Sequence, residues 1–293
     1  MIYTLTLNPS LDYIMEAPTL KQGRTNRSAC ENLRYGGKGI NVAFVLSSLG
    51  AEAIAIALLG GETGGLLLSL LKKDNLSVRP LFIEGDTRIN VKILSGEVTE
   101  LNAAGPSVKD EEIESLFLCF DKMEATDTLV LSGSIPPSVP KDIYARIIRG
   151  LNDKGVRSVL DASGEALLLA LPSHPYLIKP NESELKEVLG EMIDVESGAR
   201  ALQKMGARNV LVSLGKDGAM LLTEDGTLLL QRAPVGVSKN TVGAGDSMLA
   251  GFLYAEEMGE REALSFAVAA GSATAFRGAL ATGEEIRALF RQI

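Results

Sequence analysis

The segment from Asn240 to Ser247, with the sequence NTVGAGDS, combines features that phosphoryl transfer requires at one place. Its two glycines, Gly243 and Gly245, leave the backbone free to approach an anion. The apolar run at 248–253 predicts a helix that follows directly, and the first N–H groups of a helix attract negative charge. Asp246 falls in the first turn, where a carboxylate beside an anion site suits a general base. A plain glycine-rich turn with an acidic residue at the helix start is the alternative.

A second glycine-rich stretch, GGKGINVA at 36–43, also precedes a predicted helix. Lys38 could neutralise a phosphate, and Asn41 lies one turn into the helix on the same side as Gly37. The stretch is not a Walker A motif, because Gly39 stands where Ser or Thr should follow the lysine. The chain also contains no G-x-G-x-x-G fingerprint, which argues against a dinucleotide site.

Polar residues follow several predicted strands, where open α/β sheets bind ligands. Asp12 comes shortly after the first strand, although a turn aspartate would look the same. After another strand, Asn181 and Glu184 would face the same way on a first helical turn and suit Mg²⁺ held largely through water. The same spacing is that of a capping box, which we favour for the segment on its own.

Two further segments could border a nucleotide. Ser213, Gly215 and Gly218 end a strand in a glycine turn, which a plain hairpin entry would also explain. Residues 269–274 present a helix face of small residues. Such a face leaves room for an adenine ring, and close helix packing would explain it equally well.

Composition excludes several classes of protein. The 293-residue chain has a formal net charge of −8, which argues against a nucleic-acid partner. Two cysteines, Cys30 and Cys119, and one histidine cannot assemble a His/Cys zinc site. That histidine, His174, lies between prolines in a predicted loop, which disfavours a Ser-His-Asp triad. The first residues lack a basic leader, and no apolar run approaches the roughly 20 residues that span a bilayer. We therefore expect a cytoplasmic protein without a membrane partner.

The larger part of the chain alternates short apolar runs with amphipathic ones. Strands are predicted at 128–131, 156–160, 176–178 and 209–212, with helices between them, and a hairpin at 219–222 and 227–230. Three helical patterns close the chain at about 245–258, 261–276 and 282–291. This alternation predicts an α/β fold, with a doubly wound, mostly parallel sheet that carries helices on both faces.

Two polar, strand-like segments, 11–35 and 86–104, interrupt the alternation. In the second, Arg88, Asn90 and Lys92 share one face of a strand with period two. A half-buried strand with a solvated face is one interpretation. The other is a small β-sheet lid with its polar face over a ligand. The predicted division is therefore an α/β domain of residues 1–10, 36–85 and 105–293, and a lid of residues 11–35 and 86–104.

With these motifs together, the chain resembles the ribokinase-like PfkB carbohydrate kinases over essentially its whole length. The two glycine-rich signatures at 36–43 and 240–247, with KPNESE at 179–184 between them, carry the resemblance. Within the family, TLTLNPSLD at 4–12, TRINVK at 87–92 and LSGSIPP at 131–137 are typical of the sugar-phosphate branch, the 1-phosphofructokinases, to which tagatose-6-phosphate kinases are close relatives.

The resemblance implies a role for each motif. Asp246 would be the general base, and the amides of Gly243, Ala244 and Gly245 would form the anion hole. The implied sugar-phosphate ligands are Asp12, Gly37, Lys38, Asn41, Arg88, Asn90 and Lys92, with Arg24 as a further candidate that could reach a neighbouring subunit. The implied ATP contacts are Lys179, Asn181, Ser213, Gly215, Gly218 and Ser272. Asn181 and Glu184 would order the Mg²⁺ shell.

The implied reaction is ATP-dependent phosphorylation of fructose 1-phosphate to fructose 1,6-bisphosphate, with Mg²⁺, by a homodimer that associates through its lids. Tagatose 6-phosphate or fructose 6-phosphate is the alternative substrate. A non-enzymatic sugar-phosphate sensor on the same scaffold is the alternative outside the enzyme class.

Overall fold

The computed structural model describes residues 1–293, apart from the side chain of Glu97. A large sheet has the strand order β13-β12-β11-β10-β9-β8-β1-β4-β5, and all neighbours from β11 to β5 are parallel. Its parallel strands are apolar on both faces because helices cover both sides. They are β1 (Ile2–Thr6), β4 (Ala53–Gly60), β5 (Val78–Ile83), β8 (Thr128–Ser132), β9 (Arg157–Asp161), β10 (Leu177–Ile178) and β11 (Asn209–Ser213).

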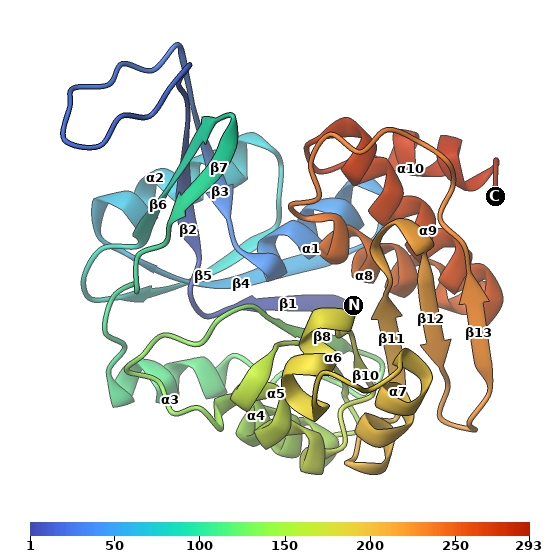
Figure 1. Ribbon diagram of the computed structural model, residues 1–293. Helices are drawn as coiled ribbons and strands as arrows, with labels where there is room; N and C mark the ends of the chain where they lie inside the picture. Colours follow the sequence, from blue (N-terminus) through green and yellow to red (C-terminus); the bar gives the residue numbers. More distant parts are fainter.

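Helices pack on both faces of this sheet (Figure 1). On one face lie α3 (Asp110–Leu118), α4 (Ile143–Asn152), α5 (Gly164–Ala170), α6 (Glu182–Leu189) and α7 (Val195–Lys204). On the other lie α1 (Lys38–Ser48), α2 (Gly61–Lys73), α8 (Ala244–Ala255), α9 (Glu260–Arg277) and α10 (Gly283–Phe290). The predicted doubly wound α/β fold is confirmed.

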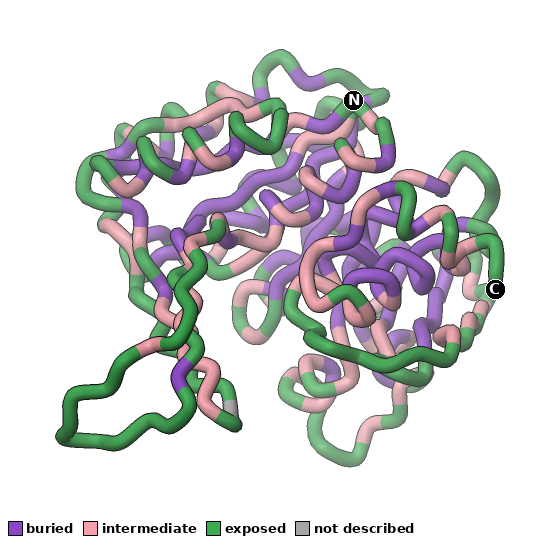
Figure 2. Tube along the Cα trace, turned by 90° about the horizontal axis from the view of Figure 1, so that it is seen from above, coloured by how far each residue is buried: buried purple, intermediate pink, exposed green. Residues whose placement is uncertain are grey.

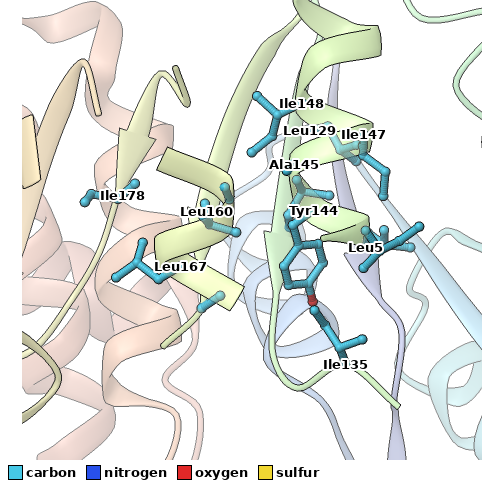
Figure 3. Close-up of a cluster of buried hydrophobic side chains, with 14 of the residues drawn as sticks. Leu5, Leu129, Ile135, Tyr144, Ala145, Ile147, Ile148, Leu160, Leu167 and Ile178 are labelled. Atoms are coloured by element: carbon cyan, nitrogen blue, oxygen red, sulfur yellow. The ribbon is translucent and has the colours of Figure 1, made fainter. Parts of the chain in front are cut away.

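The core divides along the sheet because alternate residues of each strand face opposite sides. Leu129 of β8 packs with Tyr144 of α4 on one face, as Figure 3 shows. The buried Tyr144 hydroxyl donates to the carbonyl of Gly133 at 3.0 Å, which satisfies its polar end. The next residue of β8, Val130, belongs to the cluster on the opposite face together with Leu249 of α8.

The predicted hairpin is also confirmed. It consists of β12 (Ala219–Leu222) and β13 (Leu228–Gln231), which add antiparallel strands to one edge of the sheet. His174 follows a short 3₁₀ turn (Leu171–Ser173) and lies in a loop, as expected. Among the described residues, no helix is long and apolar enough to cross a membrane.

The two polar segments form a separate small sheet with the order β3-β2-β6-β7. Its strands are β2 (Ser10–Glu16), β3 (Cys30–Gly36), β6 (Arg88–Ser95) and β7 (Glu97–Leu101). It stands off the main body (Figure 1), and Figure 2 shows that the loop between β2 and β3 is exposed, while the strands carry both exposed and intermediate residues. Asp12 follows β1, as predicted, and lies within β2, so the alternative of a turn aspartate is excluded. The division of the chain into two domains stays a prediction.

Candidate active site

A cavity of about 2230 Å³ lies between the small sheet and the ends of the parallel strands. It brings together every residue that the sequence predicted for the site except Arg24. The carboxyl ends of the parallel strands and the N-termini of α1 and α8 meet here. Parallel strands all end at the same edge of a sheet, which is where α/β folds bind ligands. Arg24 lies in the exposed loop between β2 and β3, outside the lining of this cavity.

The N-terminus of α8 opens into the cavity. Gly243 caps the helix in the left-handed region, with φ 80°, and a Cβ there would come within 2.7 Å of Leu280. The Ala244 N–H donates to the Thr241 carbonyl at 3.1 Å. The N–H groups of Gly245 and Asp246 lie in the first turn, where a helix leaves such groups without partners of its own. These two amides are therefore the ones left available to bind an anion, while the predicted roles of Gly243 and Ala244 stay predictions.

Asp246 is buried at this helix start, with 6% of its surface exposed. Its Oδ2 accepts a hydrogen bond of 2.7 Å from Nδ2 of Asn41, which comes from the first turn of α1. Burial, together with the negative charge of Asp161, raises the pKa of Asp246 to about 6, although Lys38, Asn41 and Lys179 oppose the shift. A carboxylate that ionises near pH 6 is suited to act as a base in neutral solution.

Sequence reasoning missed Asp161, a second buried carboxylate. It ends β9, and its Oδ1 lies 3.1 Å from Nζ of Lys38 and 3.4 Å from Nζ of Lys179. Burial opposes its ionisation, but Lys179 and Lys38 outweigh that effect and lower the pKa of Asp161. Its Oδ2 is buried without a hydrogen-bond partner among the described residues. The signal that could have found it is its position at a strand's C-terminal end, the same signal that drew attention to Asp12.

The two lysines flank the start of α8. Burial lowers the pKa of Lys38, but Asp161 and Asp246 outweigh it, so the net pKa is raised and the side chain stays charged. Lys179 is 5% exposed, and a Cβ on Gly245 would lie 3.1 Å from its Nζ. Lys38 is thus beside the two carboxylates. Its predicted contact with the sugar's own phosphate stays a prediction.

The small sheet contributes a polar inner face, as its period-two pattern predicted. The Asp12 carboxylate accepts from Ser10 at 2.7 Å and from Asn90 at 3.1 Å, and lies 3.0 Å from Nζ of Lys92. Gly36 of β3 is needed beside it, because a Cβ at that position would come within 2.7 Å of Asp12 Oδ1.

Arg88 lines the same cavity, but backbone carbonyls hold its guanidinium. Nε and Nη2 donate to the Asn8 carbonyl at 3.1 and 2.8 Å, and Nη1 donates to that of Ala103 at 3.0 Å. Arg88 therefore ties the strand β6 to the loops at the base of the small sheet. Its predicted role in binding the substrate stays a prediction.

At the start of α6, Asn181 and Glu184 form the capping box that the spacing suggested. Asn181 Oδ1 accepts from the Glu184 N–H at 2.8 Å, and Glu184 Oε2 accepts from the Asn181 N–H at 2.9 Å. Both side chains still line the cavity. No group of three or more His, Cys, Asp and Glu side chains with the geometry of a metal site occurs among the described residues.

The remaining predicted residues lie at the other end of the cavity. Ser213 ends β11, Gly215 and Gly218 flank the turn that follows, and Ser272 faces the cavity from α9. Gly218 has φ 105°, and a Cβ there would lie 2.0 Å from the Gln231 carbonyl, so the hairpin itself requires this glycine. Gly271 also lines the cavity, whereas Ala270 packs against Gly251 of α8. Some of the small residues of α9 thus leave room in the cavity, and others allow α9 to pack closely against α8.

The comparisons with known proteins agree with this geometry. Residues 5–287 match the pfkB family carbohydrate kinases. The chain is 40% identical to a 1-phosphofructokinase of Bacillus subtilis, over 100% of this chain and 98% of the relative, and 37% identical to a D-tagatose-1-phosphate kinase of Bacillus licheniformis, over 94% and 93%. The structure of phosphofructokinase-2 from Escherichia coli in complex with fructose-6-phosphate superposes with a TM-score of 0.92 at 32% identity, over 99% of this chain and 98% of that one.

These matches extend over the whole fold and include both glycine-rich helix starts and the strands of the small sheet. The chain therefore belongs to the pfkB family of carbohydrate kinases, phosphotransferases that use an alcohol group as acceptor.

Proposed function

We propose that this chain phosphorylates fructose 1-phosphate at its 6-hydroxyl with ATP, giving fructose 1,6-bisphosphate and ADP. The observation that supports this most is Asp246, a buried carboxylate with a pKa of about 6 in the first turn of α8, beside the amide of Gly245. The B. subtilis and B. licheniformis relatives, both named as kinases of ketose 1-phosphates, support the choice of substrate.

In the proposed reaction, Asp246 takes the proton from the sugar hydroxyl as that oxygen bonds to the γ-phosphorus of ATP. The bond from that phosphorus to the bridging oxygen of ADP breaks, and ADP leaves. Charge on the transferring phosphoryl group would be stabilised by the Gly245 and Asp246 amides and by the ammonium groups of Lys38 and Lys179. Asp161 holds these two ammonium groups in place.

Mg²⁺ would enter with ATP and neutralise charge on its phosphates. The donor set fits that arrangement, because Asn181 and Glu184 offer oxygen atoms at the cavity wall and already hydrogen-bond each other's backbone. Two such residues suit an ion that keeps most of its water and its phosphate ligands, which is what Mg²⁺ prefers. Asn181 and Glu184 are therefore proposed as the residues that order its water shell.

A coupled assay of ADP release against a panel of ketose monophosphates tests the substrate. We expect the highest kcat/KM with fructose 1-phosphate. A higher kcat/KM with tagatose 6-phosphate or fructose 6-phosphate would assign that sugar as the substrate instead, and the proposed phosphoryl transfer would stand. An absence of turnover with every ketose phosphate would overturn the kinase proposal in favour of a sugar-phosphate sensor. The paired charges around Asp246 argue against that sensor, because binding alone does not require a buried base.

We further propose a homodimer that associates through the outer face of the small sheet. On the face opposite Asp12, the side chains of Tyr13, Ile89 and Leu101 are exposed to 36, 45 and 61%. An exposed apolar sheet face of this kind is a common protein-protein interface. A cytoplasmic location remains a prediction from the sequence.

A further inference from the structure

The inner face of the small sheet carries an arginine that the sequence motifs did not single out. Arg34 of β3 is paired directly with Asp12 of β2, so the two side chains stand on the same face of the sheet. Arg34 is exposed and lines the cavity. It thus stands in the row that continues from Asp12 toward the sheet edge, because β3 is the edge strand on this side.

Three other cations close to this face are already engaged inside the protein. The Lys92 ammonium lies 3.0 Å from Asp12 and 3.8 Å from Glu100. The Lys38 ammonium lies 3.1 Å from Asp161. The guanidinium of Arg88 donates to the carbonyls described above. A phosphate that approached any of these three would have to compete with a partner in place.

Arg34 differs from them, because its side chain forms neither an ion pair nor a hydrogen bond with any of the residues that the structure describes. The Asp12 carboxylate does not hold it, since that carboxylate already accepts from Ser10 of its own strand and from Asn90 of β6, and pairs with Lys92 of β6. A guanidinium offers five N–H donors in a planar fork that matches a phosphate with two parallel hydrogen bonds.

The order of groups along the cavity fits a sugar phosphate. Asn41 and Asp246 meet at the helix starts, and Asp12 lies against Gly36 at the end of β3. Arg34 is two residues farther along that strand, about 7 Å from Gly36. A sugar whose acceptor hydroxyl meets Asp246 and whose ring hydroxyls meet Asp12 would therefore place its far end beside Arg34.

We propose that Arg34 binds the phosphate that the substrate already carries, and that it is the residue by which this site distinguishes a ketose phosphate from the free ketose. The inference rests on the proposed kinase function and adds the residue that determines its specificity. Because the phosphate is remote from the reacting oxygen, the interaction forms equally in the ground state and the transition state, so it lowers KM and leaves kcat unchanged.

The test compares Arg34→Gln with the wild type in steady-state kinetics. We expect KM for fructose 1-phosphate to rise about 10- to 100-fold, the loss that follows removal of a charge-assisted hydrogen-bonding partner. The KM for ATP and the kcat should stay at the wild-type values. The kcat/KM for free fructose should also be unchanged, because it carries no phosphate. Arg34→Lys keeps the charge without the planar fork and should recover part of the loss.

Arg149→Gln is the matched control. Arg149 is an exposed arginine in α4, away from the small sheet, that does not line the cavity, so its loss should leave every constant unchanged. A wild-type KM for fructose 1-phosphate in Arg34→Gln would overturn the inference, as would equal losses with the phosphorylated and the free sugar. If the wild type itself turns over no ketose phosphate, the kinase proposal fails first, and the role of Arg34 fails with it.

Discussion

Two buried carboxylates lie within reach of the same two lysines, and their surroundings shift their pKa values in opposite directions. Burial and the neighbouring carboxylate raise the pKa of Asp246, whereas Lys179 and Lys38 overcome burial and lower that of Asp161. Such a separation assigns a role to each group. Asp246 can exchange a proton near neutral pH, while Asp161 stays ionised and holds the lysines.

The activity should therefore depend on pH through Asp246. The base must be ionised to accept a proton, so we expect kcat to fall as pH drops below about 6. In Asp161→Asn, the negative charge that raises this pKa is gone and Lys38 and Lys179 are released, so the acid limb of the profile should move to lower pH. Profiles of kcat against pH for both proteins test this. An acid limb at the same pH in both would show that Asp161 does not influence the base.

The same burial has a consequence for stability. The pKa of Asp246 is raised from 3.8 to about 6, so the folded state favours its protonated form. The stability that the folded state gains from this protonated carboxyl is fully present below pH 3.8. It is lost as pH rises through 6, because the folded protein must then hold a buried charge. At pH 8, this penalty is on the order of 3 kcal/mol.

We therefore expect Asp246→Asn to raise Tm at pH 8 and to leave it unchanged near pH 4. The same variant should lose about 10²- to 10⁴-fold in kcat, the usual contribution of a general base. Thermal unfolding at the two pH values and steady-state kinetics measure both effects. A lower Tm at pH 8, or near wild-type turnover, would contradict this account of the site.

At the scale of the element, the N-terminus of α8 depends on the missing side chain of Gly245. A Cβ there would meet Nζ of Lys179 at 3.1 Å, in the space that an anion between the amide and the ammonium would occupy. We expect Gly245→Ala to lower kcat/KM for ATP about 10- to 100-fold through the loss of one charge-assisted contact. The helix itself should tolerate the change, because alanine is the better helix former.

Gly150→Ala is the matched control for that prediction. Gly150 lies in α4 with open space where a Cβ would be, so alanine should stabilise the fold by about 0.5–1 kcal/mol without an effect on activity. Kinetics and chemical denaturation of both variants separate the two effects. Equal activity of the two variants would show that the Gly245 site does not hold the phosphate.

Local pattern was enough to predict the elements that carry the site. The helix after NTVGAGDS, the capping box at Asn181 and the polar row of β6 all depend on residues a few positions apart. The large sheet followed from the alternation of strands and helices. Contacts between distant segments could not be predicted in this way: Lys38 meets Asp161 across 123 residues. Arg34 was missed for the same reason, because its register opposite Asp12 is a property of the folded sheet.

At the scale of the molecule, the small sheet has one polar face over the cavity and one apolar face turned away from it. Tyr13, Ile89 and Leu101 stand on the outer face, opposite the row of Asp12, Asn90 and Lys92. When an antiparallel or mixed sheet has apolar residues on its outer face, another layer of protein usually covers that face. A second copy of the small sheet is the layer that we propose, and it would join the two active-site lids into one body.

The double variant Ile89→Lys and Leu101→Lys tests this assembly. Two buried ammonium groups in each chain would face apolar surface, which is costly without a partner, so we expect the dimer to dissociate. Light scattering at several protein concentrations should give the mass of two chains for the wild type and of one for the variant. Phe82→Lys, at an exposed apolar position on β5 of the large sheet, is the matched control and should remain dimeric.

Because the dimer would hold both lids in place, the monomeric variant should also show a raised KM for the sugar phosphate. A wild type with the mass of one chain would exclude the lid-to-lid dimer and leave each active site to work alone.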